Sequence, residues 1–289
     1  MVKNNKIFQI DAFTGNSFEG NSAGVMFAGD LSSELMQKIA REMNVAETAF
    51  LSSSDKADYK LRWFTPAVEV QLCGHATIAS LHFLHENDRL PDNSSVKFDT
   101  KSGILNCGIR DGWYYMQIPI YEIEEFSGCK EEIIDAVGAE RTSVPDETPF
   151  IILDNGNLYF RVDRLKTLQS LKPDFKKLKK LTEDKHEFEG VVVYSMETID
   201  DSSFAHSRYF VPYYGIDEDP VTGSTNGPML MVFRKLGFVD AEAEDLSLVF
   251  EQGDTLGRKG RVKVSYKKSS GELYISGKAV TVLKGELTF

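Results

Sequence analysis

Four residues suited to proton transfer or anion binding lie in or near two similar stretches of this sequence. One stretch begins at Arg62 and reads RWFTPAVEVQLCGHATIAS, and the other begins at Arg208 and reads RYFVPYYGIDEDPVTGSTNGPM. A carboxylate or an imidazole can take a proton from a reacting carbon and return it, whereas a hydroxyl can hold an anion. The candidates for such chemistry are Glu47, His75, Asp219 and Ser224.

Glu47 is the expected general base. It lies in NVAETAFL, where apolar side chains between Val45 and Phe50 flank it closely. Burial disfavours the charged form of a carboxylate and raises its pKa toward neutrality, where it can both accept and donate a proton. The alternative is a glutamate on an edge strand that faces solvent.

The other three candidates each have a plainer alternative. His75 is expected to orient a substrate or relay a proton, but a lone histidine can also be a satisfied helix cap. Asp219 precedes Pro220, where an acidic turn that faces solvent is common. Ser224 has no nucleophile-elbow motif around it, so a serine hydrolase is not expected.

The two stretches belong to an internal repeat that covers about half of the chain each time. Matching residues keep the same order while their separation grows by small loop insertions. The matches are Arg62, Phe64 and Pro66 with Arg208, Phe210 and Pro212 at 146 residues, Gly74 and His75 with Gly223 and Ser224 at 149, and Phe98 with Phe250 at 152. This period is far longer than that of solenoid repeats, so the pattern predicts a duplicated domain.

In each copy a glycine stands where a strand is expected to turn into an apolar helix. The first turn of a helix carries unpaired N–H donors and the positive end of the helix dipole. Two such ends facing one another across a domain cleft would bind a carboxylate or an enolate. The residues expected to bind substrate are Asn21, Ser22, Cys73, Gly74, Gly223 and Thr225.

A racemase that uses two thiols is not expected. Cys73 precedes Gly74, but Thr222 stands at the equivalent position of the second copy, and a threonine is a poor base. Cys73 is therefore expected to be a small buried side chain. A racemase or epimerase that pairs Cys73 with another kind of base stays open.

The sequence suggests no metal or nucleotide site. The three cysteines, Cys73, Cys107 and Cys129, show no CxxC spacing, which indicates a reducing compartment without disulfides. His82 and His85 have no third ligand at a usual spacing, so packing or hydrogen bonding is expected for them. The glycine-rich segment 15–27 matches neither the dinucleotide nor the phosphate-loop pattern and is expected to be a loop.

Composition restricts the classes of function further. The chain has 289 residues, 42% of them hydrophobic, which suits two domains. A net charge of -11 argues against binding to nucleic acid or anionic membranes. No apolar run approaches the roughly 20 residues of a membrane helix, and the start of the chain lacks the apolar core of a signal peptide. A cytoplasmic protein is expected.

Periodicity and turn residues predict the elements around these sites. Helices are expected at 32–44, 74–86, 173–181 and 224–236, of which 74–86 and 224–236 are apolar enough to be buried. Strands are expected at 6–13, 47–53, 59–65, 96–99, 103–108, 113–118, 150–153, 158–162, 190–194, 207–211, 246–251, 260–266, 272–276 and 280–283.

In several of its motifs the chain resembles the phenazine-biosynthesis PhzF-like family of isomerases. The resemblance rests on QIDAFT…GNSAGV, NVAETAFL, RWFTPAVEVQLCGHAT and DEDPVTGST, and the strand pattern continues beyond them. It implies the α+β fold of diaminopimelate epimerase, in which two pseudo-repeated domains each roll a mostly antiparallel sheet around a central helix. The expected domains are 1–119, joined by the C-terminal strand 279–289, and 120–278.

The resemblance also implies roles for particular residues. The acidic base of the family falls on Glu47, its histidine on His75, and its aspartate and serine on Asp219 and Ser224. The implied reaction is a proton shift on a small carboxylate-bearing metabolite, without a metal or another cofactor. Ser22 stands where many relatives have proline, which changes the stiffness of the loop.

The resemblance leaves the substrate and the pathway open. It implies a homodimer, in line with the exposed sheet edges expected of rolled domains. Fold-level kinship does not establish catalysis, so a catalytically silent binding protein on the same scaffold is the remaining alternative.

Overall fold

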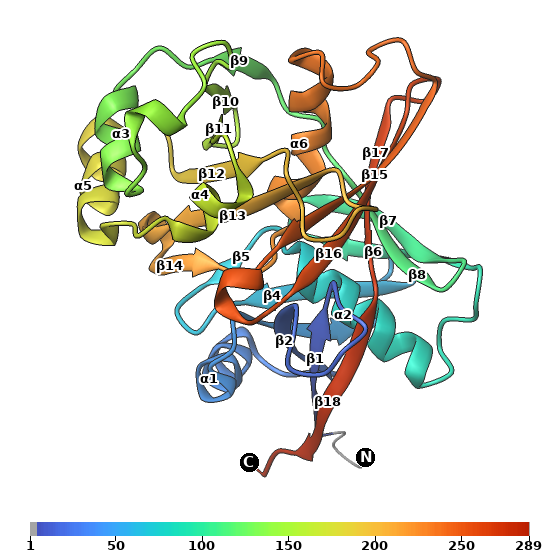
Figure 1. Cartoon of the computed structure of the whole chain (residues 1–289). Coiled ribbons are helices and arrows are strands. Elements are labelled where there is room, and N and C mark those ends of the chain that lie inside the picture. The colour runs from blue at the N-terminus through green and yellow to red at the C-terminus, as the bar shows by residue number, and fades with distance from the viewer. Residues whose placement is uncertain (1–4, 289) are drawn as a thin grey trace. The chain divides into compact units, whose positions relative to one another are not determined.

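The computed structural model describes residues 5–288 and divides the chain into two compact units (Figure 1). Unit 1 comprises Met1–Ile118, Gly260–Val262 and Leu273–Phe289, of which residues 1–4 and 289 are not described. Unit 2 comprises Pro119–Lys259 and Lys263–Glu272. No helix in the described part is both long and apolar enough to cross a membrane.

Unit 1 is a mixed sheet in which antiparallel pairs outnumber parallel ones. Going across it, β18 pairs with β1, β1 with β2, β2 with β3, β3 with β4, β4 with β6, β6 with β7, β7 with β8 and β8 with β17; only β2–β3 and β4–β6 are parallel. Its strands are β1 (Lys6–Ala12), β2 (Asn21–Phe27), β3 (Glu47–Ser52), β4 (Tyr59–Phe64), β5 (Glu69–Val70), β6 (Ser95–Thr100), β7 (Gly103–Arg110), β8 (Trp113–Ile118), β17 (Glu272–Gly277) and β18 (Ala279–Glu286). Its helices are α1 (Ser33–Met43) and α2 (Gly74–Glu86).

Unit 2 repeats the same order of pairings. β10 pairs with β11 antiparallel, β11 with β12 parallel, β12 with β13 antiparallel and β13 with β15 parallel, as β1, β2, β3, β4 and β6 do in unit 1. The strands are β9 (Ile123–Glu125), β10 (Ile151–Leu153), β11 (Asn157–Arg161), β12 (Gly190–Ser195), β13 (Ala205–Val211), β14 (Ile216–Asp219) and β15 (Asp245–Gln252), and β16 (Gly260–Lys267) has residues assigned to each unit. The helices are α3 (Lys130–Ala136), α4 (Leu165–Ser170), α5 (Phe175–Lys185) and α6 (Gly223–Lys235), with short 3-10 turns at Arg141–Ser143, Pro212–Tyr214 and Asp254–Leu256.

In each unit one apolar helix is buried against the sheet. α2 packs on β1, β2, β3, β8 and β18 of unit 1. In unit 2 the ring of Phe233 on α6 lies against Tyr194 of β12 and Phe250 of β15. Other side chains of these sheets form separate clusters, with α1 in unit 1 and with α3, α4 and α5 in unit 2. The predicted buried helices are confirmed, since their apolar surfaces leave no face suited to water.

The ladders confirm the internal repeat. Arg62 pairs with Phe50, and Arg208 pairs with Val193 in the matching strands. Each arginine also holds a glutamate with two hydrogen bonds: Arg62 donates to Glu69 at 2.7 and 2.9 Å, and Arg208 donates to Glu218 at 2.8 and 2.7 Å. These bidentate pairs fix the hairpins that lead into α2 and α6.

The segment 15–27 is partly a strand, and its prediction as a loop is wrong. Asn21–Phe27 forms β2, which pairs with β1 and β3 and buries Ala23, Val25 and Met26. Gly24 is needed there because a Cβ atom would lie 2.8 Å from Thr48 Oγ1. Of the glycines that suggested a loop, Gly24 in fact permits close packing of β2 on β3. Three short strands, β5, β9 and β14, were also missed.

Candidate functional site

Glu47, Cys73 and His75 lie together in unit 1. Glu47 Oε2 is 3.1 Å from His75 Nε2, and Cys73 Sγ is 3.6 Å from His75 Nδ1. The side chain of His75 is 7% exposed and that of Glu47 is 14% exposed. The imidazole is therefore held between a thiol and a carboxylate that keeps limited access to solvent.

Two adjoining elements position this cluster. Glu47 is the first residue of β3, which has a partner on each side, so the alternative of an edge strand is wrong. Cys73 is the N-cap of α2 in an extended conformation, and His75 lies in the first turn. The hairpin between β4 and α2 brings the start of the helix back to the start of β3, which no local pattern reveals.

The electrostatics of the cluster favour a charged imidazole. Burial disfavours the imidazolium, but the Glu47 carboxylate, 3.1 Å from the ring, favours it by its charge and its hydrogen bond and raises the pKa of His75 above its ordinary value. Burial, with the Glu47 charge as a second cause, raises the pKa of the Cys73 thiol. The arrangement thus favours the protonated forms of both the thiol and the imidazole, next to the Glu47 oxygen that the imidazole contacts.

Cys73 is buried, as expected, but it is more than a packing residue. Its sulfur contacts the same imidazole that Glu47 holds. The donor atoms of Glu47, Cys73 and His75 lie within 4.8 Å of one another and, within residues 5–288, are the one group of three with the spacing of metal ligands.

In unit 2 Asp219 is tied to the start of α6. Asp219 ends β14 and accepts a hydrogen bond from the hydroxyl of Thr222, the N-cap of that helix. A carboxylate paired in this way is oriented by its neighbours, which disfavours its alternative as a solvated turn residue.

Gln252 is a buried residue of this region that the sequence interpretation missed. Its Oε1 accepts hydrogen bonds from the Thr222 backbone at 3.0 Å and from Asn226 Nδ2 at 2.5 Å. Its Nε2 donates to the Asp219 carbonyl at 2.8 Å and to Thr222 Oγ1 at 3.1 Å. The one available signal was the polar pair Glu251–Gln252 directly after the apolar run LVF.

The remaining candidates near α6 differ in burial and in the hydrogen bonds that they make within the protein. Ser224 is half-buried in the first turn, and Gly223 is buried at the start of the helix. Thr225 is buried, donates its hydroxyl to the Thr222 carbonyl at 3.1 Å and accepts a bond from Tyr159 at its own carbonyl. Thr225 thus has a clear structural role.

In unit 1 the β2–β3 ladder separates the two remaining candidates. Ala23 pairs with Glu47, so Asn21, two residues earlier on the parallel strand, shares the face of Glu47. Ser22 points to the opposite face, where it accepts a hydrogen bond from Gln9 at 2.9 Å. Gly74 begins α2, directly before His75.

His82 and His85 make hydrogen bonds, as expected. His82 Nδ1 is 3.0 Å from the Tyr114 hydroxyl and its Nε2 is 3.0 Å from Thr281 Oγ1. His85 Nδ1 lies 2.9 Å from the Leu90 carbonyl. Both rings therefore tie the end of α2 to its surroundings.

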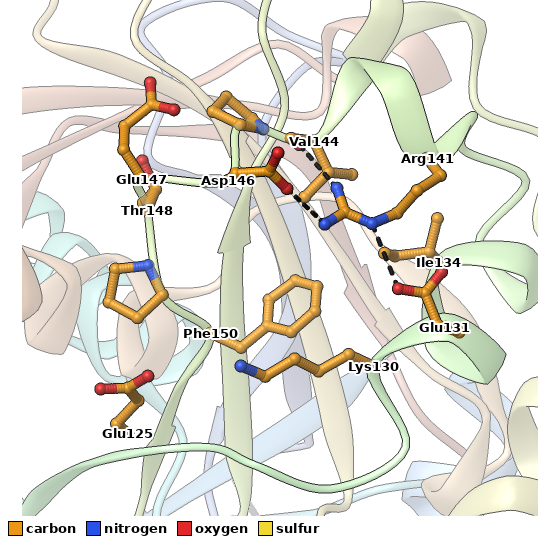
Figure 2. A pocket seen from close by; sticks show the side chains of 12 residues that line it. Glu125, Lys130, Glu131, Ile134, Arg141, Val144, Asp146, Glu147, Thr148 and Phe150 are labelled. Carbon is orange, nitrogen blue, oxygen red and sulfur yellow. Dashed lines mark hydrogen bonds and ion pairs between the residues drawn. The ribbon is translucent and has the colours of Figure 1, made fainter.

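A pocket of about 350 Å³ lies elsewhere in unit 2, between α3 and the segment 141–150 (Figure 2). Figure 2 shows Arg141 engaged by Glu131, Asp146 and the Val144 carbonyl, and Lys130 extended beside Phe150. None of the candidate residues lines it, and its basic groups are already paired or placed over a ring. The cluster of Glu47, Cys73 and His75 is therefore better suited to proton transfer than this pocket.

Known proteins match the chain over nearly its whole length. A family model described as phenazine biosynthesis-like protein matches residues 10–285. An uncharacterized isomerase of Clostridium acetobutylicum is 36% identical over 303 residues, covering 99% of each chain. The crystal structure of a PhzF family protein of Bacillus anthracis matches with a TM-score of 0.91 and 30% identity, covering 100% of each chain.

A more distant structure extends the likeness of the fold. A probable proline racemase of Agrobacterium radiobacter has a TM-score of 0.62 at 13% identity, over 98% of this chain and 93% of that one. The predicted α+β, diaminopimelate epimerase-like fold is therefore confirmed, and the class of isomerase agrees with the names of the curated relatives. With a match over residues 10–285, the chain belongs to the phenazine biosynthesis-like protein family.

Proposed function

We propose that this enzyme moves a proton between carbon atoms of a small carboxylate-bearing metabolite, with Glu47 as general base and then general acid. The observation that carries the proposal is the 3.1 Å pair between Glu47 and a buried His75 whose pKa is raised. Glu47 is the carboxylate of this cluster. It has limited access to solvent and lies at the start of an interior strand, which suits a general base.

The reaction balances with a single carboxyl group. The Glu47 carboxylate takes a proton from a C–H bond, and the electron pair left behind enlarges the conjugated system next to the substrate carboxylate. The same carboxyl group then returns the proton to another carbon of that system. His75 holds Glu47 by its hydrogen bond in both steps, which keeps the carboxyl group in one orientation.

The helix starts suit the anionic end of such a substrate. Neither α2 nor α6 has a side-chain hydrogen bond at its N-cap or an acidic residue in its first turn. The first turns begin with Gly74 and Gly223, whose lack of a side chain suits the approach of an anion to the N–H donors, and Ser224 adds a hydroxyl. We propose that Asp219, oriented by Thr222 and Gln252, positions the substrate or relays a proton, and that Asn21 borders the face of Glu47.

That one ligand engages residues of both units remains a prediction. If this prediction is correct, Glu47→Gln and Ser224→Ala each change the binding or the exchange of the same acid. A variant of one unit that leaves this acid unaffected would restrict the site to the other unit.

A racemase built on Cys73 is the weaker reading. The raised pKa of Cys73 disfavours the thiolate that such an enzyme needs. At the equivalent position of unit 2, the Thr222 hydroxyl donates its hydrogen bond to Asp219, so it is not a second base.

The decisive experiment is C–H exchange in heavy water, followed by NMR with a panel of small unsaturated and amino-substituted carboxylic acids. The protein is expected to incorporate deuterium into at least one acid. Glu47→Gln should lower that exchange by about 100- to 10,000-fold, the usual contribution of a general base, while the acid still binds.

Glu34→Gln is the matched control, because Glu34 pairs with Lys38 on the surface of α1. It is expected to exchange at the rate of the unaltered protein. Retained exchange in Glu47→Gln would remove Glu47 from this role. Binding of acids without exchange by the unaltered protein would instead identify a catalytically silent binding protein.

A further inference from the structure

We propose that Glu47, Cys73 and His75 form a binding site for a thiophilic divalent cation, with Zn²⁺ as its best occupant, and that this cation blocks the enzyme. The blocking effect rests on the proposed function of Glu47. The cation site itself rests only on the geometry and chemistry of the three side chains.

The donor set is one that zinc prefers. Zinc binds thiolate, imidazole and carboxylate groups, and three protein ligands with one open position is a common arrangement. Hard cations such as Mg²⁺ prefer oxygen ligands only, so the sulfur of Cys73 selects against them.

The distances between the donor atoms are close to those around a tetrahedral ion. With zinc bonds of about 2.0–2.3 Å, neighbouring ligand atoms lie about 3.3–3.6 Å apart. His75 Nε2 is 3.1 Å from Glu47 Oε2 and 4.0 Å from Cys73 Sγ, and all three donors lie within 4.8 Å. Small rotations of these side chains bring the atoms to bonding distance.

The site is also supported and accessible. Cys73 and His75 belong to the start of a buried helix and Glu47 to an interior strand, so little backbone order must be gained on binding. The 14% exposure of Glu47 leaves an approach for an ion, whereas Cys73 and His75 are buried. Binding releases the thiol proton and the second imidazole proton to solvent, because the ligands are thiolate and neutral imidazole.

A cation bound in this way prevents Glu47 from acting as the general base. The Glu47 oxygen that accepts the substrate proton becomes a metal ligand, and His75 can no longer donate its hydrogen bond to Glu47. We therefore expect Zn²⁺ to act as an inhibitor that competes with the proton and the substrate for the same carboxylate.

Cobalt absorption spectroscopy tests the site without reference to activity. Metal-free full-length protein is titrated with Co²⁺, whose bond to a thiolate gives a charge-transfer band in the near ultraviolet. One equivalent is expected to bind, and one equivalent of Zn²⁺ should displace it. Cys73→Ser should abolish the band, and Glu47→Gln should weaken binding by about tenfold or more, as the loss of a metal contact does.

Cys129→Ser is the matched control, because Cys129 also has a carboxylate nearby, with its sulfur 3.9 Å from Glu187 Oε2. It should leave the titration unchanged. A band that survives Cys73→Ser and disappears in Cys129→Ser would overturn the proposal, as would the absence of a band. Circular dichroism of each variant shows whether its fold is intact, and Glu47→Gln, at a partly exposed position, provides a second test if Cys73→Ser fails to fold.

The two proposals fail in different ways. Cobalt binding together with undiminished exchange would overturn the blocking effect while leaving the cation site. Absence of exchange in metal-free protein would count against the proposed function, and the titration would still decide the site. Competition between Zn²⁺ and an acid that binds then decides whether the cation excludes the substrate.

Discussion

The starts of α2 and α6 have the same backbone and different chemistry. Both helices have 13 residues, an extended N-cap and no side-chain cap. Their first residues read Cys73–Gly74–His75 in unit 1 and Thr222–Gly223–Ser224 in unit 2. The duplication thus kept two helix starts without a side-chain cap, but only the start of α2 carries a thiol and an imidazole.

The matching strands β3 and β12 also differ in their titratable residues, and packing explains the difference. Glu47 lies three residues before Phe50, the partner of Arg62, and Gly190 lies three residues before Val193, the partner of Arg208. A Cβ atom at position 190 would lie 2.6 Å from the ring of Tyr209. Packing therefore leaves no room for a carboxylate at position 190, the counterpart of Glu47, which suits transfer by one carboxyl group better than racemisation by two equivalent bases.

Substitution of Gly190 should have the largest effect on stability. Gly190→Glu is expected to prevent unit 2 from folding, because it forces a charged side chain into the ring of Tyr209. The milder Gly190→Ala should lower the free energy of unfolding by about 1–3 kcal/mol, as overpacking does. Urea denaturation followed by circular dichroism measures both.

The reverse change, Glu47→Gly, is the control, and it should fold because Glu47 is partly exposed. An unchanged unfolding midpoint for Gly190→Ala would mean that Tyr209 moves aside freely. The contrast between the strands would then have no packing cause.

Gln252→Leu should have the next largest effect. It removes the acceptor of the Thr222 N–H, and an unsatisfied buried polar group costs about 1–3 kcal/mol. Gln252→Glu keeps that acceptor but turns an oxygen toward the Asp219 carbonyl in place of the Nε2 donor, so it should destabilise as well. The same denaturation curves measure both variants, and an unchanged midpoint in Gln252→Leu would show that these hydrogen bonds contribute nothing.

His75 should make stability depend on pH. Because its folded-state pKa is raised, its stabilisation is present below the unfolded pKa of about 6.5 and is lost as pH rises through the folded value. The stability difference between the unaltered protein and His75→Gln should therefore shrink as pH increases above about 6.5. NMR should also show a lower His75 pKa in Glu47→Gln, and an unchanged value would exclude Glu47 as a cause.

Cys73→Ala should have the smallest effect on catalysis. The raised pKa keeps Cys73 a thiol, so single-carboxyl chemistry loses no acid or base when it is removed. Deuterium exchange is expected to remain close to that of the unaltered protein. Loss of exchange with an intact fold would favour the racemase alternative, in which the thiol takes part in the reaction.

Much of the local architecture was predictable from the residues. Both buried helices and most strands follow from periodicity, and the ladder that pairs Tyr59 with Phe98 and Ala205 with Phe250 reproduces the predicted repeat. The strand β2 was not predictable, since its glycine and asparagine signal a loop until the contact of Gly24 with Thr48 is known. Residues such as these depend on neighbours distant in the chain.

The residues alone determined the duplication, the glycine at each helix start and the identity of Glu47, His75, Asp219 and Ser224 as candidates, because these depend on residue types and their order along the chain. Only the tertiary structure decided that Glu47 meets His75 and Cys73, that Gln252 holds the Asp219–Thr222 turn, and that Tyr209 fills the space of a side chain at position 190. Such contacts arise when strand pairing and helix packing bring distant segments within a few ångströms, and a linear pattern carries no record of that distance.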